Sequence, residues 1–257
     1  MHILRSAKLI FTKSTLIIAF LSCLSTLFCI SYELYADFSL ALIGIAVVFP
    51  IVFSINGAYK RREVALNLYG TLKAHGRVIY FAIRDWMPNP DNRRLEYLKH
   101  LLYDIMGSTR KMFSATKGQS AQLERHIYAK FSELSIFINK CRNWGLVQGD
   151  ASRVNQYLSK MLDAFESMKH IYEYRTPITL RAYSKIFTYA LPIFYGPYFA
   201  NVARGIHPGL IFIMPVLFSL ILVSLDNIQD HLENPYDLVG EDDIIIRVEK
   251  FIGWLDS

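Results

Sequence analysis

Residues 38–63 read FSLALIGIAVVFPIVFSINGAYKRRE. The first part of this stretch, Phe38–Asn56, carries no charged residue. At about 1.5 Å per residue it is long enough to cross roughly 30 Å of hydrocarbon. A basic triplet follows at residues 60–62. Because basic residues collect on the cytosolic side of membrane helices, the stretch predicts a membrane helix that ends in the cytosol.

The same helix is predicted to continue well beyond the membrane. Apolar residues recur at helical spacing after the basic triplet, at Val64, Leu68, Leu72, Val78 and Phe81. Only isolated glycines interrupt this pattern before Pro88-Asn89-Pro90, which marks its end. An unbroken helix over this distance would be about 70 Å long.

Three further uncharged runs predict membrane helices, at Ser14–Tyr32, Ile186–Val202 and Gly209–Leu225. The last two contain prolines, which membrane helices tolerate when neighbouring groups satisfy the freed carbonyls. The first run follows basic residues, as a signal peptide would. Since it leads into Glu33 and a second apolar run rather than into small residues, we expect a retained helix.

The basic residues fix the expected orientation. The chain has 257 residues, of which 53% are hydrophobic and 19% charged, and a formal net charge of +6. With both termini in the cytosol, the flanking basic residues fall on one side, and the other side carries chiefly Arg204. Topology therefore explains the excess charge, and no basic patch interleaved with exposed aromatics suggests nucleic acid.

The expected fold is an all-α membrane protein with about four transmembrane helices and a helical cytosolic region. The cytosolic helices are predicted near Arg94–Thr109, Ser120–Trp144 and Ser152–Tyr172, with a short tail helix from Glu241 to Leu255. The predicted divisions are 1–57 for the N-terminal segment and first two spans, 58–180 for the cytosolic region, 181–228 for the last two spans and 229–257 for a cytosolic tail. Compact size and the absence of a transit-like leader fit a multi-pass protein of a bacterial inner (plasma) membrane.

No sequence motif indicates catalysis. P-loop, HExxH, GxSxG and Gly-rich dinucleotide patterns are all missing, the seven histidines are scattered, and the three cysteines form no CxxC pair. We therefore predict that the chain is not an enzyme and that it carries no catalytic residues and no required cofactor.

One stripe on the second membrane helix suggests a pore. Ile45, Phe49 and Phe53 are spaced four residues apart, so they share one helix face, and Pro50 removes a backbone hydrogen bond beside them. Around an axis, copies of this helix would form apolar rings, which can gate by dewetting and whose phenylalanine edges tolerate an anion. The alternative is an apolar stripe that packs against neighbours or lipid.

Three segments resemble the bestrophin family. Residues 44–63 with Leu68-Tyr69-Gly70 look like the family's neck helix and its continuation. Glu233-Asn234-Pro235-Tyr236, with the acidic residues after it, is similar to the segment that follows the last membrane helix. Residues 175–192 resemble the start of the third. Arg62 stands where the family usually has an aromatic and Tyr69 where it has Trp, and the spacing between Pro177 and Pro192 is shorter, which indicates a divergent relative.

The resemblance implies a homopentamer around a central pore, with Ile45, Phe49 and Phe53 as neck rings. The family includes chloride and other anion channels and, among bacterial members, cation-selective channels. The expected partners are therefore further copies of the chain, permeant ions and the lipid bilayer. A non-conducting scaffold of the same architecture and a small-molecule transporter are the rival interpretations, although the four apolar runs lack the charged residue that coupled transporters usually need.

The acidic segment Glu241-Asp242-Asp243 has two interpretations. In animal bestrophins an acidic cluster here helps to form a calcium clasp, and calcium requires hard oxygen ligands. Alternatively Asp242 or Asp243 caps the tail helix, which we favour. Three further acids occupy successive helical turns, and we expect them to pair with lysine or arginine near the membrane rather than with a metal: Asp226, Asp230 and Glu233.

Overall fold

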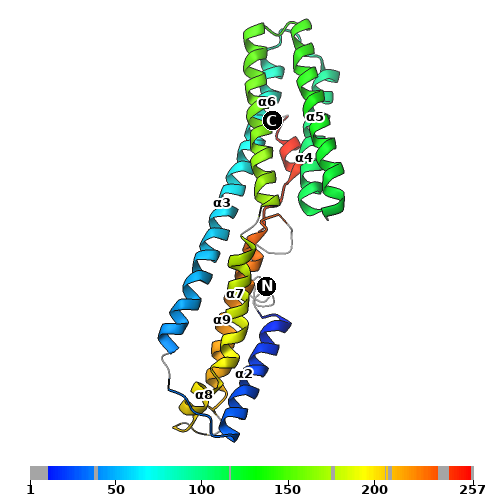
Figure 1. Cartoon of the computed structure of the whole chain (residues 1–257). Helices are drawn as coiled ribbons and strands as arrows, with labels where there is room; N and C mark the ends of the chain where they lie inside the picture. Colours follow the sequence, from blue (N-terminus) through cyan, green and yellow to red (C-terminus); the bar gives the residue numbers. More distant parts are fainter. Residues whose placement is uncertain are drawn as a thin grey trace. The chain divides into compact units, whose positions relative to one another are not determined.

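The computed structural model describes residues 11–37, 40–115, 117–174, 177–205, 207, 210–236 and 243–255. Within these ranges the secondary structure is helical, without β-strands, as predicted (Figure 1). The helices are α2 (Lys13–Ser31), α3 (Leu40–Trp86), α4 (Asn92–Ser114), α5 (Lys117–Asn143), α6 (Gln148–Glu173), α7 (Ile178–Phe194), α8 (Gly196–Ala203), α9 (Ile213–Glu233) and α10 (Val248–Gly253).

The chain divides into two compact units. Unit 1 contains α2, α3 up to Arg62, and α7 to α9. Unit 2 contains α3 from Glu63 onward, α4 to α6, and α10. The predicted long second helix is confirmed, because α3 runs without interruption for 47 residues and ends just before Pro88.

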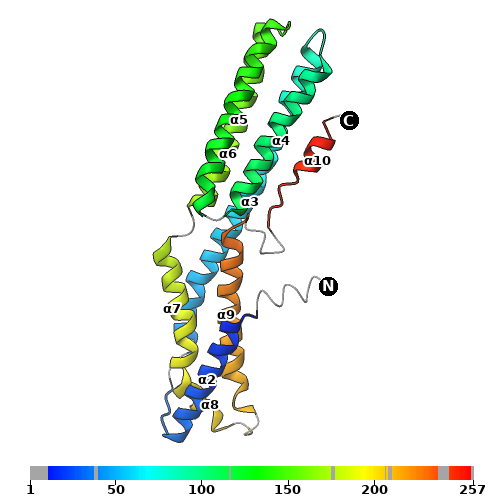
Figure 2. The ribbon, with the colours of Figure 1, turned by 90° about the vertical axis from the view of Figure 1, so that its right-hand side faces the viewer.

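Helices α2, α7 and α9 pack side by side in unit 1 (Figures 1 and 2). Asn227 of α9 donates hydrogen bonds to Thr12 and Thr15, at the start of α2, over 3.2 and 3.3 Å. At the opposite end of α2, the N–H of Ala36 donates to the carbonyl of Pro197 at 3.3 Å. Helices α2 and α7 therefore run in the same direction and α9 runs in the opposite one, as expected for the first, third and fourth helices of an up-and-down arrangement.

The third predicted run is divided in two by a break between α7 and α8. Gly196 and Pro197 begin α8 directly after Tyr195. Pro197 has no N–H to donate to the carbonyl of Ile193. The Ser25 hydroxyl of α2 donates to that carbonyl at 2.7 Å, so a neighbouring helix satisfies the group freed by the break.

Two helices in the described ranges are long and apolar enough to cross a membrane, α2 and α9. The third predicted span does not form such a helix, because the break at Tyr195 limits α7 to 17 residues. The second predicted span, Phe38–Asn56, begins outside the described residues, and its crossing stays a prediction.

Unit 2 has its own apolar core, contributed by α3, α4, α5, α6 and the segment that ends in α10. Leu72, Leu102, Ile138 and Phe165 are among its fully buried side chains. The three predicted cytosolic helices correspond to α4, α5 and α6, each somewhat longer than expected.

The predicted tail helix is largely wrong. Residues 243–247 are not helical, and α10 begins only at Val248. Ile244 and Ile246 are buried while Ile245 between them is 53% exposed, the alternation of an extended segment against a core. Asp243 lies five residues before α10, and therefore it does not cap that helix.

Candidate functional site

The first part of α3 has two distinct faces. One face is buried within unit 1, where Val47 and Ile51 pack against a cluster of side chains from α7, α8, α9 and the turn between α7 and α8. That cluster comprises Leu191, Tyr195, Phe199 and Leu222. The periodicity of a helix then directs the residues two positions away to the opposite side.

The opposite face carries the predicted stripe. Ile45, Phe49 and Phe53 are 64%, 61% and 57% exposed. The rings of Phe49 and Phe53 meet edge to face with their centroids 4.6 Å apart. Helix α3 is continuous through Pro50, whose nitrogen has no hydrogen to donate. A rigid, apolar and partly aromatic surface, open to a partner or to lipid, therefore lies along this helix.

A charged residue, Lys60, follows the apolar stripe on the same face of α3. It lies two helical turns after Phe53 and on the same face, and it is exposed. Gly57, between them, has open space where a side chain would stand. Along this face the side chains thus change from apolar at Phe53 to cationic at Lys60, over about 10 Å of helix rise.

The acidic candidates are only partly described. Glu241 and Asp242 lie outside the described residues, so the calcium interpretation stays a prediction. In the described ranges no group of three or more His, Cys, Asp or Glu side chains is positioned to hold a metal ion.

The pairing predicted for α9 is correct for two of its three acids. Arg181 pairs with Glu233 at 2.9 Å, and Lys185 pairs with Asp230 at 2.7 Å. Asp226 forms no close ion pair in the described part of the chain: Lys185 acts on it only at longer range, and the residue one turn further along α7 is Tyr189. Neither carboxylate oxygen of Asp226 has a hydrogen-bond partner in the described part of the chain, and the side chain is fully buried.

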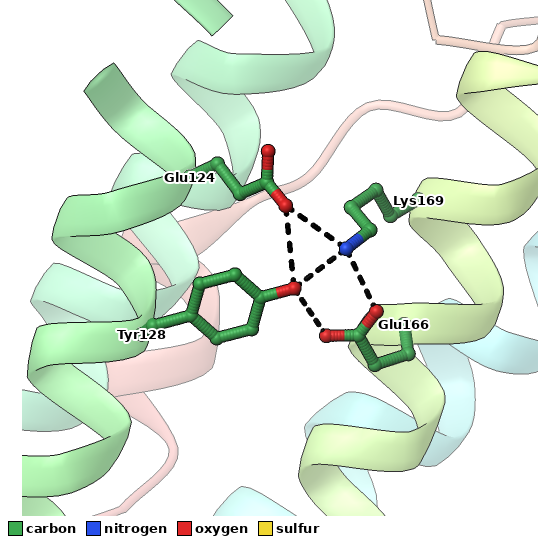
Figure 3. Close-up of polar contacts among 4 residues, drawn as sticks. All are labelled: Glu124, Tyr128, Glu166 and Lys169. Carbon is green, nitrogen blue, oxygen red and sulfur yellow. Dashed lines mark hydrogen bonds and ion pairs between the residues drawn. The ribbon is translucent and has the colours of Figure 1, made fainter. Parts of the chain in front are cut away.

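A polar network that the sequence did not predict links α5 to α6 in unit 2 (Figure 3). Lys169 contacts Glu124 at 2.9 Å, the Tyr128 hydroxyl at 2.5 Å and Glu166 at 2.8 Å. Tyr128 in turn donates to Glu166 at 2.5 Å. The spacing of Glu124 and Tyr128, and of Glu166 and Lys169, is typical of side chains that meet on one helix. The sequence does not indicate that Tyr128 and Glu166, which are far apart along the chain, contact each other.

The contacts within this network shift the pKa values of Glu166 and Lys169. Burial acts to raise the pKa of Glu166, but hydrogen bonds from Lys169 and Tyr128 outweigh burial and hold that pKa below its ordinary value. Burial likewise opposes the charge of Lys169, yet its three partners hold the pKa of Lys169 well above the ordinary range. Both groups therefore stay charged near neutral pH and tie the two helices together.

No known protein-family model matches the sequence, and no curated protein matches it. Solved structures do match. A mutant of a bacterial bestrophin homologue from Klebsiella pneumoniae is similar at 17% identity and a TM-score of 0.76, over 93% of this chain and 95% of that one. A structure of such a homologue from Klebsiella pneumoniae, phased with zinc, is 16% identical with a TM-score of 0.77, over 95% of this chain and 94% of that one. A mutant described as a membrane protein is 15% identical with a TM-score of 0.78, over 95% of this chain and 97% of that one.

These matches cover nearly the whole of each chain, so they define the class of fold: an all-helical, bestrophin-like architecture. The chain therefore has a bestrophin-like fold, as the three sequence segments predicted. At such low identity the likeness concerns the fold, and activity has to be argued from the residues.

Proposed function

We propose that this protein is an oligomeric ion channel, most simply a homopentamer, which passes chloride or other small anions. One observation carries the proposal. On the face of α3 turned away from the core of unit 1, Ile45, Phe49 and Phe53 form an exposed apolar stripe in a chain with a bestrophin-like fold. Several copies of this stripe around an axis would make a narrow, dewettable neck.

The proposal requires four membrane crossings, by α2, the first part of α3, α7 with α8, and α9. The up-and-down contacts within unit 1 support it. With both termini in the cytosol, Lys13 at the start of α2, the triplet 60–62, and Arg181 with Lys185 on α7 all fall on the cytosolic side. A bacterial inner membrane is the proposed location.

Lys60 favours anions over cations as the permeant species. It stands on the same face as Phe53, and a ring of such side chains would bring positive charge to the cytosolic end of the neck. No carboxylate shares that face between Ile45 and Lys60.

The decisive experiment is recording from the purified protein in planar bilayers under a KCl gradient, with the size of the assembly measured in parallel. Discrete currents that reverse near the chloride potential are the expected result. Reversal near the potassium potential would replace the proposal by a cation channel of the same fold. Silence from a well-formed oligomer would favour a scaffold, and a monomer in mild detergent would contradict the central pore.

A further inference from the structure

Buried polar atoms without partners gather between α7 and α9. Seven buried side-chain nitrogen and oxygen atoms, on five residues of these two helices, lack a regular hydrogen bond in the described part of the chain. The five residues are at most 3% exposed, and we call them the polar seam: Ser184, Thr188, Asp226, Gln229 and Glu233. Buried polar groups normally have hydrogen-bond partners, so a cluster of buried polar atoms without them suggests that a ligand binds there.

The ion pairs define the register of the seam. Arg181 meets Glu233 and Lys185 meets Asp230, so α7 and α9 run in opposite directions. One turn further, the same register places Thr188 and Tyr189 opposite Asp226. The Tyr189 hydroxyl lies close enough to the Asp226 carboxylate to interact with it, although the contact falls short of regular hydrogen-bond geometry.

The seam carries one uncompensated negative charge. Arg181 pairs with Glu233 and Lys185 with Asp230, so the seam has three carboxylates for two cations, and Asp226 interacts with Lys185 only at longer range. Burying a carboxylate without a close cation is costly, and an ionisable group in a proposed membrane helix is a candidate functional site. One bound positive charge would balance the seam.

The unpartnered atoms are of one chemical kind. Six of the seven are oxygens: two from the Asp226 carboxylate, and one each from Ser184, Thr188, Gln229 and Glu233. Two other buried hydroxyls of unit 1, those of Thr26 and Ser219, donate to the carbonyl one turn back. The hydroxyls of Ser184 and Thr188 make no such bond and keep their lone pairs available.

We propose that the polar seam binds a monovalent metal cation of the sodium type, with Asp226 as its charged ligand and with Thr188 and Gln229 among its neutral ones. Hard cations select oxygen ligands. Calcium sites usually gather several carboxylates, whereas here the charge to be balanced is one. None of these residues belongs to the stripe on α3, so cation binding can be measured without measuring conduction.

The test is thermal unfolding of the full-length protein in detergent, with sodium chloride exchanged for N-methyl-glucamine chloride at constant ionic strength. Chloride is thereby held constant, which separates this test from any anion effect. A Tm that rises with sodium and saturates is expected for the wild type. Asp226→Asn should remove the sodium dependence while leaving the protein folded without sodium, because the buried charge is gone.

Two further variants sharpen the test. Thr188→Val keeps the shape of the side chain and removes one ligand, so it should raise the half-saturating sodium concentration by about tenfold. Combining Lys185→Gln with Asp230→Asn removes one charge of each sign, and therefore the sodium dependence should persist at a lower Tm. If Asp226→Asn does not fold, the half-saturating sodium concentration of Thr188→Val tests the proposal instead, and a value equal to that of the wild type would contradict it.

Three results would overturn the proposal. The first is a wild-type Tm that is indifferent to sodium. The second is an identical sodium dependence in wild type and Asp226→Asn. The third is a Tm that follows pH but not sodium, which would make the occupant a proton.

Discussion

Ser25 donates a hydrogen bond of 2.7 Å to the carbonyl of Ile193, three residues before Gly196. The two helices approach so closely here that a β-carbon on Gly196 would stand 2.3 Å from the Ser25 hydroxyl and 3.1 Å from its backbone. This crossing compensates for the missing N–H of Pro197 and fixes the break between α7 and α8 against α2.

Gly196→Ala should destabilise unit 1 by about 1–3 kcal/mol, because the added methyl meets backbone that cannot move aside. The measurement is the Tm of the purified protein in detergent. Gly205→Ala is the matched control, since nothing lies within 4 Å of a β-carbon there. Equal stability of the two variants would mean that the crossing is looser than described.

Phe53→Ala should increase ion flux by about tenfold, the effect of lowering a permeation barrier by about 1.4 kcal/mol, since removing an aromatic ring widens and wets the neck. Unitary conductance and open probability in planar bilayers provide the measurement. Phe20→Ala on α2 is the control, because Phe20 is 67% exposed but does not belong to the stripe. Unchanged flux through an intact Phe53→Ala oligomer would count against this position as a constriction.

Lys60→Glu should shift the reversal potential under a KCl gradient away from chloride and toward potassium, because it replaces a ring of positive charge by a negative one. Lys60→Arg keeps the charge and should keep the wild-type reversal potential. Identical selectivity in all three proteins would show that Lys60 does not face the permeation path.

Acidification should loosen unit 2 through Glu166. The pKa of Glu166 is depressed in the folded chain, so its stabilising contribution is complete above the ordinary value of 4.5 and is lost as the pH falls through the lower folded value. Because the Glu166 side chain is 41% exposed and solvent screens its ion pair, Glu166→Gln should lower stability by about 0.5–1 kcal/mol at neutral pH and flatten the acid limb of the unfolding curve. Thermal unfolding followed by tryptophan fluorescence measures both effects.

Glu173→Gln is the control for this prediction, because Glu173 lies exposed on the same helix. An acid limb that is unchanged in Glu166→Gln would assign the acid sensitivity to other carboxylates.

Helices with a strong period were predictable from sequence. The apolar period through α3 persisted across Gly57, Gly70 and Gly76, so its continuity to Trp86 could be expected. The residues of the stripe followed from the same period, although their exposure on the face opposite Val47 and Ile51 required the packing of unit 1.

Features set by packing between distant segments were not predictable. The tail was expected to be helical from Glu241, but Tyr69 accepts a hydrogen bond from the N–H of Arg247 at 2.9 Å, where the chain is extended. Likewise, Asp226 was expected to pair with a cation, and only the register of α7 against α9 reveals that Tyr189 stands opposite it.

The C-terminal segment, residues 243–255, also constrains the order of folding, because it packs into the core of unit 2. Phe251 occupies the space beside Gly76, and Ile244, Val248 and Leu255 complete the same core as α3 to α6. Ribosomes deliver those residues only after α9 has been synthesised. The α3 to α6 part of unit 2 must therefore persist through the production of α7 to α9 with an apolar surface uncovered, which makes this interval the stage of biogenesis most exposed to aggregation and most dependent on chaperones.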